Sequence, residues 1–309
     1  MGVVAAALWS VGALAAGAAA TVWLERRAGS GAPEPGPALA LDLRHEPRLT
    51  ARDAWLYAAA PFVAILGVCF AIVTIPFGPS LLGRDLQIGL FYLLVVVDFV
   101  VLGVALGGWG ANTPDSVEAC YRIVAQLVAY VVPLGLAVIG PAMMARSLSL
   151  QSIVEAQSRS GHWYVVSQPL GFLLYLTTAL MQSYRSPFCA PFAREIGGGV
   201  LAAYGAWKAV CWRIALSGLL FVVAAAGAVL FLGGGQGPFL PGPVWMLLKT
   251  FALLFFMVWA GARLRPASTA ETLALGWKVL IPAGLVNVLV VGALILLGVG
   301  QTPFAGAPR

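Results

Sequence analysis

The chain has 309 residues, of which 61% are hydrophobic and only 10% are charged. Soluble domains carry about a quarter charged residues, so this chain has too little polar surface to cover a water-soluble globule. The composition predicts an integral membrane protein. The formal net charge is +6, but no basic run is interleaved with aromatic residues, which argues against nucleic-acid binding.

Hydrophobic runs of about 20 residues, each long enough to cross roughly 30 Å of hydrocarbon as a helix, recur along the chain. We predict an all-α integral membrane protein that forms one membrane domain over residues 1–309, with about eight transmembrane helices. The predicted helices lie near residues 2–24, 54–76, 86–108, 122–144, 163–182, 209–233, 243–262 and 275–298. The first is too long, and too poorly followed by a cleavage site, to be a removable signal peptide.

Basic residues are distributed unevenly between the two sides of this predicted bundle. The connections after the first, third, fifth and seventh helices hold most of them: Arg26, Arg27, Arg44, Arg48, Arg52, Arg122, Arg185, Arg194, Lys208, Arg213, Arg263, Arg265 and Lys278. Cytoplasmic loops of membrane proteins are enriched in lysine and arginine, so these connections should face the cytoplasm. An even number of helices then places both termini on the outer side.

Two charged residues lie within predicted helices. Asp98 is in the middle of the third helix, in the run VVVDFVV. An acid at this depth is costly and is a candidate proton carrier, although an aspartate held neutral or hydrogen-bonded to a neighbouring helix is the alternative. Lys249 in the seventh helix is its candidate partner. Gln126 and Tyr130 are spaced i, i+4 in the fourth helix, so both face one side, where they could line a hydrated path or bind helices together.

A polar segment separates the fifth and sixth predicted helices, QSYRSPFCAPFAREIGGGVLAAYGA at 182–206. Pro187 and Pro191 forbid a continuous helix, and the three glycines permit a left-handed turn or close backbone approach. Irregular backbone near membrane depth persists only where it lines a cavity or is covered by protein. We therefore predict a broken cytoplasmic-side loop that is either a cavity wall or a docking surface, shielded by neighbouring chains.

Cysteine and histidine residues are few and scattered. The chain has four cysteines but no Cys-x-x-Cys pair, and its two histidines, His45 and His162, are far apart. We expect no metal or iron–sulfur site within this chain alone. No G-x-G-x-x-G motif follows a strand and no phosphate loop occurs, so we expect no bound nucleotide.

Short motifs occur in a fixed order along the chain. They are GWGAN at 108–112, YRIVAQLVAY at 121–130, SLSLQSIVEAQ at 147–157, RSPF at 185–188 and GWKVLIP at 276–282, with ERR at 25–27 after the first helix. Together they resemble the H subunit of bacterial NADH–quinone oxidoreductase, the counterpart of mitochondrial subunit 1 of complex I. The resemblance covers roughly residues 54–300 and is specific because all of these motifs recur in order.

The resemblance implies a subunit that joins the membrane arm to the peripheral arm, forms much of the quinone chamber and starts the polar path that couples quinone reduction to proton pumping. Quinone would be the substrate, and FMN and iron–sulfur clusters would lie in partner subunits rather than in this chain. The partners would be other membrane-arm subunits, the peripheral iron–sulfur and quinone-site subunits, and lipid. The protein would be a multi-pass component of the bacterial inner (plasma) membrane.

The resemblance also suggests quinone-chamber residues. These candidates are Arg26, Arg27, Arg185, Phe188, Glu195 and Tyr204. Three of them have a plainer interpretation: Arg185 could extend its charge to the lipid headgroups, Glu195 could pair with a neighbouring arginine, and Tyr204 could be a packed interfacial tyrosine.

The chain departs from the family pattern at acidic positions. Gln182 stands where the family has a glutamate, and Cys189 where it has an aspartate. Val131 and Ala203 also replace glutamates, whereas Glu195 keeps the last acid of the loop. The replacing side chains cannot carry a proton at physiological pH, so we expect the proton-coupling path to be interrupted or rerouted.

Two other functions fit the same sequence. One is the membrane anchor of an energy-converting hydrogenase or formate hydrogenlyase, which shares this ancestry. The other is a structural paralogue that holds an assembly together without coupling. A solute transporter fits poorly because the chain shows no internal repeat of the kind that transporters have.

Overall fold

The structure is a computed structural model that describes residues 12, 15–24, 53–78, 85–192 and 198–298. These residues form helices and connecting turns, and none of them lies in a β-strand. Six helices are long and apolar enough to cross a membrane: Ala54–Val73, Gly89–Ala111, Pro114–Ala145, Trp207–Phe231, Gly242–Arg263 and Thr269–Leu296. Two shorter apolar helices are Ala15–Leu24 and Pro169–Gln182. The all-α membrane architecture is confirmed, whereas the number of eight crossings stays a prediction.

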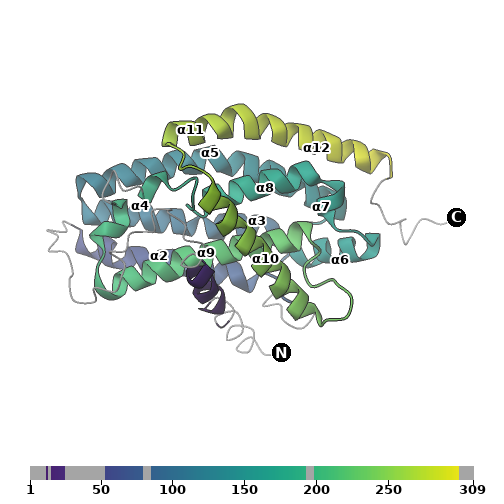
Figure 1. The fold of residues 1–309 in the computed structure, drawn as a ribbon, viewed down its shortest axis with the longest axis horizontal. Helices are drawn as coiled ribbons and strands as arrows, with labels where there is room; N and C mark the ends of the chain where they lie inside the picture. The colour runs from purple at the N-terminus through teal and green to yellow at the C-terminus, as the bar shows by residue number, and fades with distance from the viewer. Residues whose placement is uncertain (1–11, 13–14, 25–52, 79–84, 193–197, 299–309) are drawn as a thin grey trace.

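The helices are labelled in chain order in Figure 1. They are α2 (Ala54–Val73), α3 (Gly89–Val97), α4 (Phe99–Ala111), α5 (Pro114–Ala145), α6 (Leu150–Ser160), α7 (Tyr164–Ser167), α8 (Pro169–Gln182), α9 (Ala206–Phe231), α10 (Gly242–Arg263), α11 (Thr269–Leu275) and α12 (Ile281–Leu296). Two short 3₁₀ turns, η2 (Ala190–Phe192) and η4 (Gly199–Ala203), lie between α8 and α9, and a π-helical turn, η5 (Gly276–Leu280), joins α11 to α12.

Two hydrophobic runs that we predicted as single helices are divided. The run 86–108 is broken at Asp98, which ends α3 and begins α4. The run 163–182 is broken at Gln168, between α7 and α8. Pro169 occupies the first position of α8, where a missing N–H is tolerated, so it favours a helix start over a continuous helix. Mean hydropathy detects neither break, because the flanking residues are apolar on both sides.

Helix α5 begins well before the predicted run at 122–144. The Thr113 hydroxyl accepts a hydrogen bond from the Ser116 N–H at 3.3 Å, and Pro114 follows as the first helical residue. This combination is a strong helix start. The polar residues of the first turns lower the hydropathy there, so the apolar run underestimates the length of the helix.

Helix α9 lies at the centre of the bundle (Figure 1), and nearly all of it is buried. Helices α2, α8 and α10 pack against it. Gly227 allows Tyr175 of α8 to approach, since a Cβ added there would lie 2.7 Å from the Tyr175 Cε1 atom. The Tyr175 hydroxyl donates to the Val223 carbonyl at 2.6 Å. Small residues thus let polar side chains reach the backbone of the central helix.

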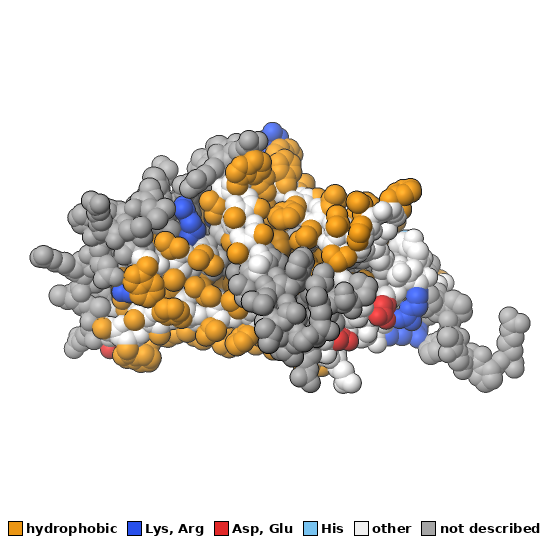
Figure 2. Space-filling view, turned by 90° about the horizontal axis from the view of Figure 1, so that it is seen from below, with side chains coloured by type: hydrophobic (Ala, Val, Ile, Leu, Met, Phe, Trp, Pro, Cys, Tyr) orange, Lys and Arg blue, Asp and Glu red, His pale blue; other side chains and the backbone are white. Residues whose placement is uncertain are grey.

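The outer surface is mainly apolar. Apolar side chains cover much of the described surface in Figure 2, with charged side chains at its margins. Large apolar residues such as Val95, Leu289 and Trp55 are exposed. In water such a surface would be unfavourable, but it suits contact with lipid.

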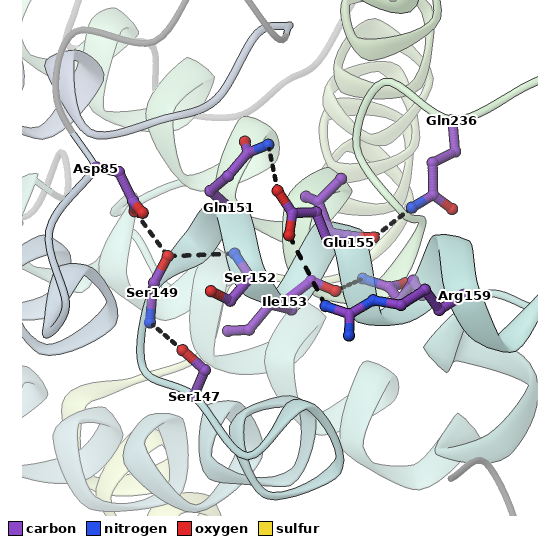
Figure 3. Close-up of polar contacts among 11 residues, drawn as sticks. Asp85, Ser147, Ser149, Gln151, Ser152, Ile153, Glu155, Arg159 and Gln236 are labelled. Carbon is purple, nitrogen blue, oxygen red and sulfur yellow. Dashed lines mark hydrogen bonds and ion pairs between the residues drawn. The ribbon is translucent and has the colours of Figure 1, made fainter. Parts of the chain in front are cut away.

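At one end of the bundle, α6 lies against α5 and α9. The Ser149 hydroxyl begins α6 by accepting from the Ser152 N–H at 3.1 Å, and it donates to Asp85 Oδ1 at 2.6 Å (Figure 3). On the same helix, Gln157 Nε2 donates to the Val229 carbonyl near the end of α9 at 2.9 Å. These bonds fix α6 across this end, which is opposite to the end that holds the segment between α8 and α9.

Candidate functional site

The segment between α8 and α9 is enclosed by this chain. Every residue from 183 to 192 is buried except Arg185, which is half-buried. We expected neighbouring chains to shield this segment, and for residues 183–192 that expectation is wrong, because helices of the same chain cover them. Burial also removes residues 186–192 as a docking surface. The following residues, 193–197, lie outside the described part of the chain.

Two side chains of α5 hold the segment from one side. Gln126 Nε2 donates to the carbonyl oxygens of Met181 at 2.6 Å and Phe188 at 3.0 Å. One turn earlier, Arg122 Nη1 donates to the Ala190 carbonyl at 3.3 Å. Carbonyls of a non-helical segment need donors in a medium without water, and this pair supplies them. Sequence reasoning missed Arg122, although its i, i+4 spacing from Gln126 was a usable signal.

Helix α10 and the chain after it cover the segment from the other side. A Cβ added at Gly261 would collide with the Ser186 carbonyl oxygen, so α10 passes directly over the segment. Beyond α10, the Ala267 N–H donates to the Pro187 carbonyl at 2.8 Å. The prolines interrupt the helix, and backbone and side-chain donors around them satisfy the exposed carbonyls.

Tyr204 forms a reciprocal pair with Tyr57 of α2. Their rings stack at 4.2 Å between centroids with an interplanar angle of 9°. The Tyr204 hydroxyl donates to the Tyr57 carbonyl at 3.0 Å, and the Tyr57 hydroxyl donates to the Ala203 carbonyl at 2.8 Å. Burial raises the pKa of Tyr204, which therefore stays a protonated donor at neutral pH. Lys208 Nζ lies 4.7 Å from the centre of the Tyr57 ring. The Tyr204 hydroxyl thus binds backbone in this structure.

Asp98 is the centre of a small polar network inside the bundle. The Tyr130 hydroxyl of α5 donates to Asp98 Oδ1 at 3.0 Å. Gln182 Nε2, from the last residue of α8, donates to the same oxygen at 3.3 Å. Asp98 and Tyr130 were predicted as proton-path candidates, and Gln182 was noted only as a replaced acid. The break between α3 and α4 brings the carboxyl to the two donors.

A small cavity of about 20 Å³ lies beside this network. Its lining comes from α3, α5, α8 and α9: Leu90, Leu93, Leu94, Val97, Leu134, Val138, Tyr175, Gln182, Val222, Val223, Ala226 and Leu230. Only Tyr175 and Gln182 among these are polar, and the Tyr175 hydroxyl already binds the Val223 carbonyl. A cavity with such walls favours apolar contents over water.

Lys249 lies away from Asp98. Its Nζ donates to the carbonyl oxygens of Leu232 at 2.5 Å, Gly234 at 3.0 Å and Gln236 at 2.6 Å. The Trp163 ring centre lies 4.4 Å away, in a cation–π contact. Leu232 follows the end of α9 that is opposite to Tyr204. The structure therefore uses the three Lys249 donors to close the connection between α9 and α10, and does not bring them to Asp98.

Other predicted residues cannot be placed or have backbone roles. Arg26, Arg27 and Glu195 lie outside the described residues. Phe188 is buried, and its N–H donates to the Arg185 carbonyl at 2.8 Å. Within the described ranges, no three His, Cys, Asp or Glu side chains come together as metal ligands would.

Comparison with known proteins identifies the family. The model of the NADH dehydrogenase family matches residues 41–292. The first of two NADH-quinone oxidoreductase H subunits, from Geobacter metallireducens, is 36% identical over 255 residues, which are 79% of this chain and 77% of that protein. The H subunit of Syntrophotalea carbinolica is 35% identical over 251 residues, covering 78% and 76% of the two chains. The H subunit of Dehalococcoides mccartyi strain 195 is 32% identical over 285 residues, covering 87% and 80%. The resemblance that the motifs indicated is confirmed: this chain belongs to the NADH dehydrogenase family and is a homologue of the H subunit, a membrane component of NADH–quinone oxidoreductase.

Proposed function

We propose that this chain forms part of the quinone chamber, and the junction between membrane and peripheral arms, of a complex I-like NADH:quinone oxidoreductase. The observation that carries the proposal is the buried, non-helical segment at 183–192, whose carbonyls are held by Arg122, Gln126 and the Ala267 N–H. A wall fixed from two sides gives a bound ring a constant geometry. Family membership supports quinone, rather than another ligand, as the molecule that this wall contacts.

The proposal assigns roles around this wall. Arg185 is half-buried at its edge and can present a cation to a quinone carbonyl. Phe188 supplies apolar packing, and Tyr204 fixes the end of the segment against α2. Arg26, Arg27 and Glu195 remain proposed chamber residues.

The proposed complex supplies what this chain lacks. FMN and iron–sulfur clusters are assigned to partner subunits, along with the peripheral quinone-site subunit and the other membrane-arm subunits. The names of the relatives, which are subunits of an NADH–quinone oxidoreductase, support this assignment. The proposed location is a bacterial inner membrane with both termini on the outer side, supported by the distribution of lysine and arginine.

Proton coupling is proposed to be weak. Asp98 is the acid nearest the middle of a candidate span among the described residues, and its network contains Gln182 where the family pattern has a glutamate. We assign Asp98 and Tyr130 to the remaining proton path. Gln126 and Lys249, whose polar groups bind backbone carbonyls, are assigned to holding the fold.

A photoreactive quinone analogue tests the chamber directly. The purified complex is irradiated with the analogue, and labelled peptides are identified by mass spectrometry, with excess unlabelled quinone as the competitor. The proposal predicts competed labelling between residues 183 and 205, reduced by Arg185→Gln. The matched control, Arg159→Gln on α6 at the opposite end, should leave labelling unchanged. Competed labelling confined to other subunits would contradict the proposal.

A further inference from the structure

The side chain of Tyr184 is unusual in three ways. It is the second residue after α8 and has a positive φ of 53°, in the left-handed region that costs a non-glycine residue roughly 1–2 kcal/mol. It is 4% exposed. Its hydroxyl makes no hydrogen bond of standard length and angle with any other described residue.

Packing alone does not favour a hydroxyl at this position. Leaving a buried donor unpaired costs about 1–3 kcal/mol, which a phenylalanine of the same shape avoids. The ring is already anchored by an edge contact with Phe192, at 5.8 Å between centroids and 85° between planes. A strained backbone and an unpaired buried donor together are typical of a functional constraint.

The Tyr184 hydroxyl is directed toward the Asp98 network. Burial raises its pKa, and Tyr130 and Asp98 are both near enough to act on that pKa as well. Tyr130 uses its own proton to donate to Asp98 Oδ1, so its oxygen lone pairs remain able to accept. The neighbours are therefore complementary: a donor without an acceptor lies beside an acceptor with capacity.

We propose that Tyr184 is the proton donor that connects the segment at 183–192 to Asp98, in the order Tyr184, Tyr130, Asp98. This inference rests on the proposed function, since it gives the quinone-chamber wall a link to the mid-membrane carboxyl. A small rotation closes the Tyr184 to Tyr130 hydrogen bond. The Tyr130 proton then moves to Asp98 Oδ1 as the Tyr184 proton moves to the Tyr130 oxygen, and Tyr184 is reprotonated by water at the segment. One proton is transferred and no electron moves.

The surroundings make Asp98 the end of this chain. Gln182, the second donor to Asp98, borders the cavity between α3, α5, α8 and α9. The rest of that lining is apolar apart from Tyr175, whose proton is held by the Val223 carbonyl. A proton that reaches Asp98 thus has no hydroxyl or carboxyl to continue to on the cavity side.

Redox-induced infrared difference spectroscopy of the purified complex tests the proposal. The spectrum on quinone reduction should contain the C=O band of protonated Asp98, recognised by its loss in Asp98→Asn. In Tyr184→Phe this band should be lost while quinone binding and assembly are kept. The matched control is Tyr164→Phe, because the Tyr164 hydroxyl is also buried without a partner among the described residues but lies on α7. That variant should keep the band.

Each outcome decides one proposal. If Asp98→Asn removes no band, Asp98 does not change protonation, and both the proposed path and the Tyr184 link fail. If Asp98→Asn removes a band that Tyr184→Phe leaves unchanged, only the Tyr184 link fails. Should Tyr184→Phe not assemble, 3-fluorotyrosine incorporated at position 184 preserves the ring and hydroxyl with greater acidity. The proposal then predicts a faster rise of the Asp98 band, and an unchanged rate overturns it.

Discussion

At the residue scale, side-chain donors to backbone carbonyls hold the irregular parts of this bundle. Gln126 serves the segment between α8 and α9, Lys249 serves the connection between α9 and α10, and Tyr204 serves the contact with α2. A lipid bilayer offers no water to unpaired carbonyls, so each donor substitutes for the missing helical hydrogen bond. Polar residues within an apolar chain can therefore be structural as well as functional.

Gln126→Leu should loosen the quinone-chamber segment. Leucine has a similar size but leaves the carbonyls of Met181 and Phe188 without their side-chain donor, at a cost of about 1–3 kcal/mol. We expect a lower melting temperature of the purified complex and a loss of quinone reductase activity. Gln151→Leu, on the exposed face of α6, should change neither. Full activity and stability in Gln126→Leu would contradict the role assigned to this side chain.

Lys249→Met should affect stability without affecting coupling. The substitution removes the donor from three carbonyls and should cost about 2–4 kcal/mol. Because Lys249 binds the connection between α9 and α10, we expect protons translocated per quinone to be unchanged in the fraction that assembles. Lys278→Met, at an exposed position, is the control for charge removal. A reduced proton yield at unchanged melting temperature would instead return Lys249 to the proton path.

At the element scale, glycines set the distances between helices. A Cβ added at Gly110 of α4 would lie 2.8 Å from the Tyr57 Cα of α2, closer than real contacts allow. At Gly103 of α4, it would lie 2.9 Å from the Ala60 carbonyl oxygen. Close helix approach through small residues is a common mode of packing in membranes. The same contact positions Tyr57 for its pair with Tyr204.

Gly110→Ala should separate α2 from α4. Overpacking of this kind costs about 1–3 kcal/mol, and we expect a lower melting temperature together with reduced quinone reductase activity, since Tyr57 moves with α2. Gly135→Ala in α5 is the matched control, because nothing lies within 4 Å of the added Cβ. That change should be neutral or slightly stabilising. Equal effects of the two substitutions would argue against a packing role for Gly110.

Apolar runs predict where helices lie better than where they end or break. The run at 243–262 and the helix α10 nearly coincide, because polar or breaking residues bound both. In contrast, Asp98 and Pro169 interrupt long runs at single positions, and averaging over a window removes single residues. Helix α5 begins before its run because capping by Thr113 depends on hydrogen bonds rather than hydropathy.

The same limit applies to the candidate site. Asp98 and Tyr130 could be named from the sequence because polar residues at membrane depth are rare. Their contact could not be predicted, since it joins the α3–α4 break to α5 across 32 positions. Tyr184 was not singled out, because its unpaired hydroxyl and positive φ exist only in the folded chain.

At the scale of the whole molecule, this chain combines the scaffold of its family with few of the acids that the family pattern has. Central helix α9 is almost entirely buried, while α12 packs mainly on α5. The wall at 183–192 is enclosed within the chain, and the polar network beside it ends at one carboxyl. Quinone binding and proton transfer are thus separable in this protein: the first depends on the wall and the second on Asp98.

The number of protons translocated per quinone reduced tests this account most directly. It is measured with the purified complex in sealed vesicles containing a pH-sensitive dye, beside a reference complex whose corresponding membrane component keeps the full set of acids. We expect a lower yield for the complex with this chain, a further fall to background in Asp98→Asn, and quinone reductase activity that persists in that variant. A yield equal to that of the reference complex and unchanged in Asp98→Asn would contradict the account.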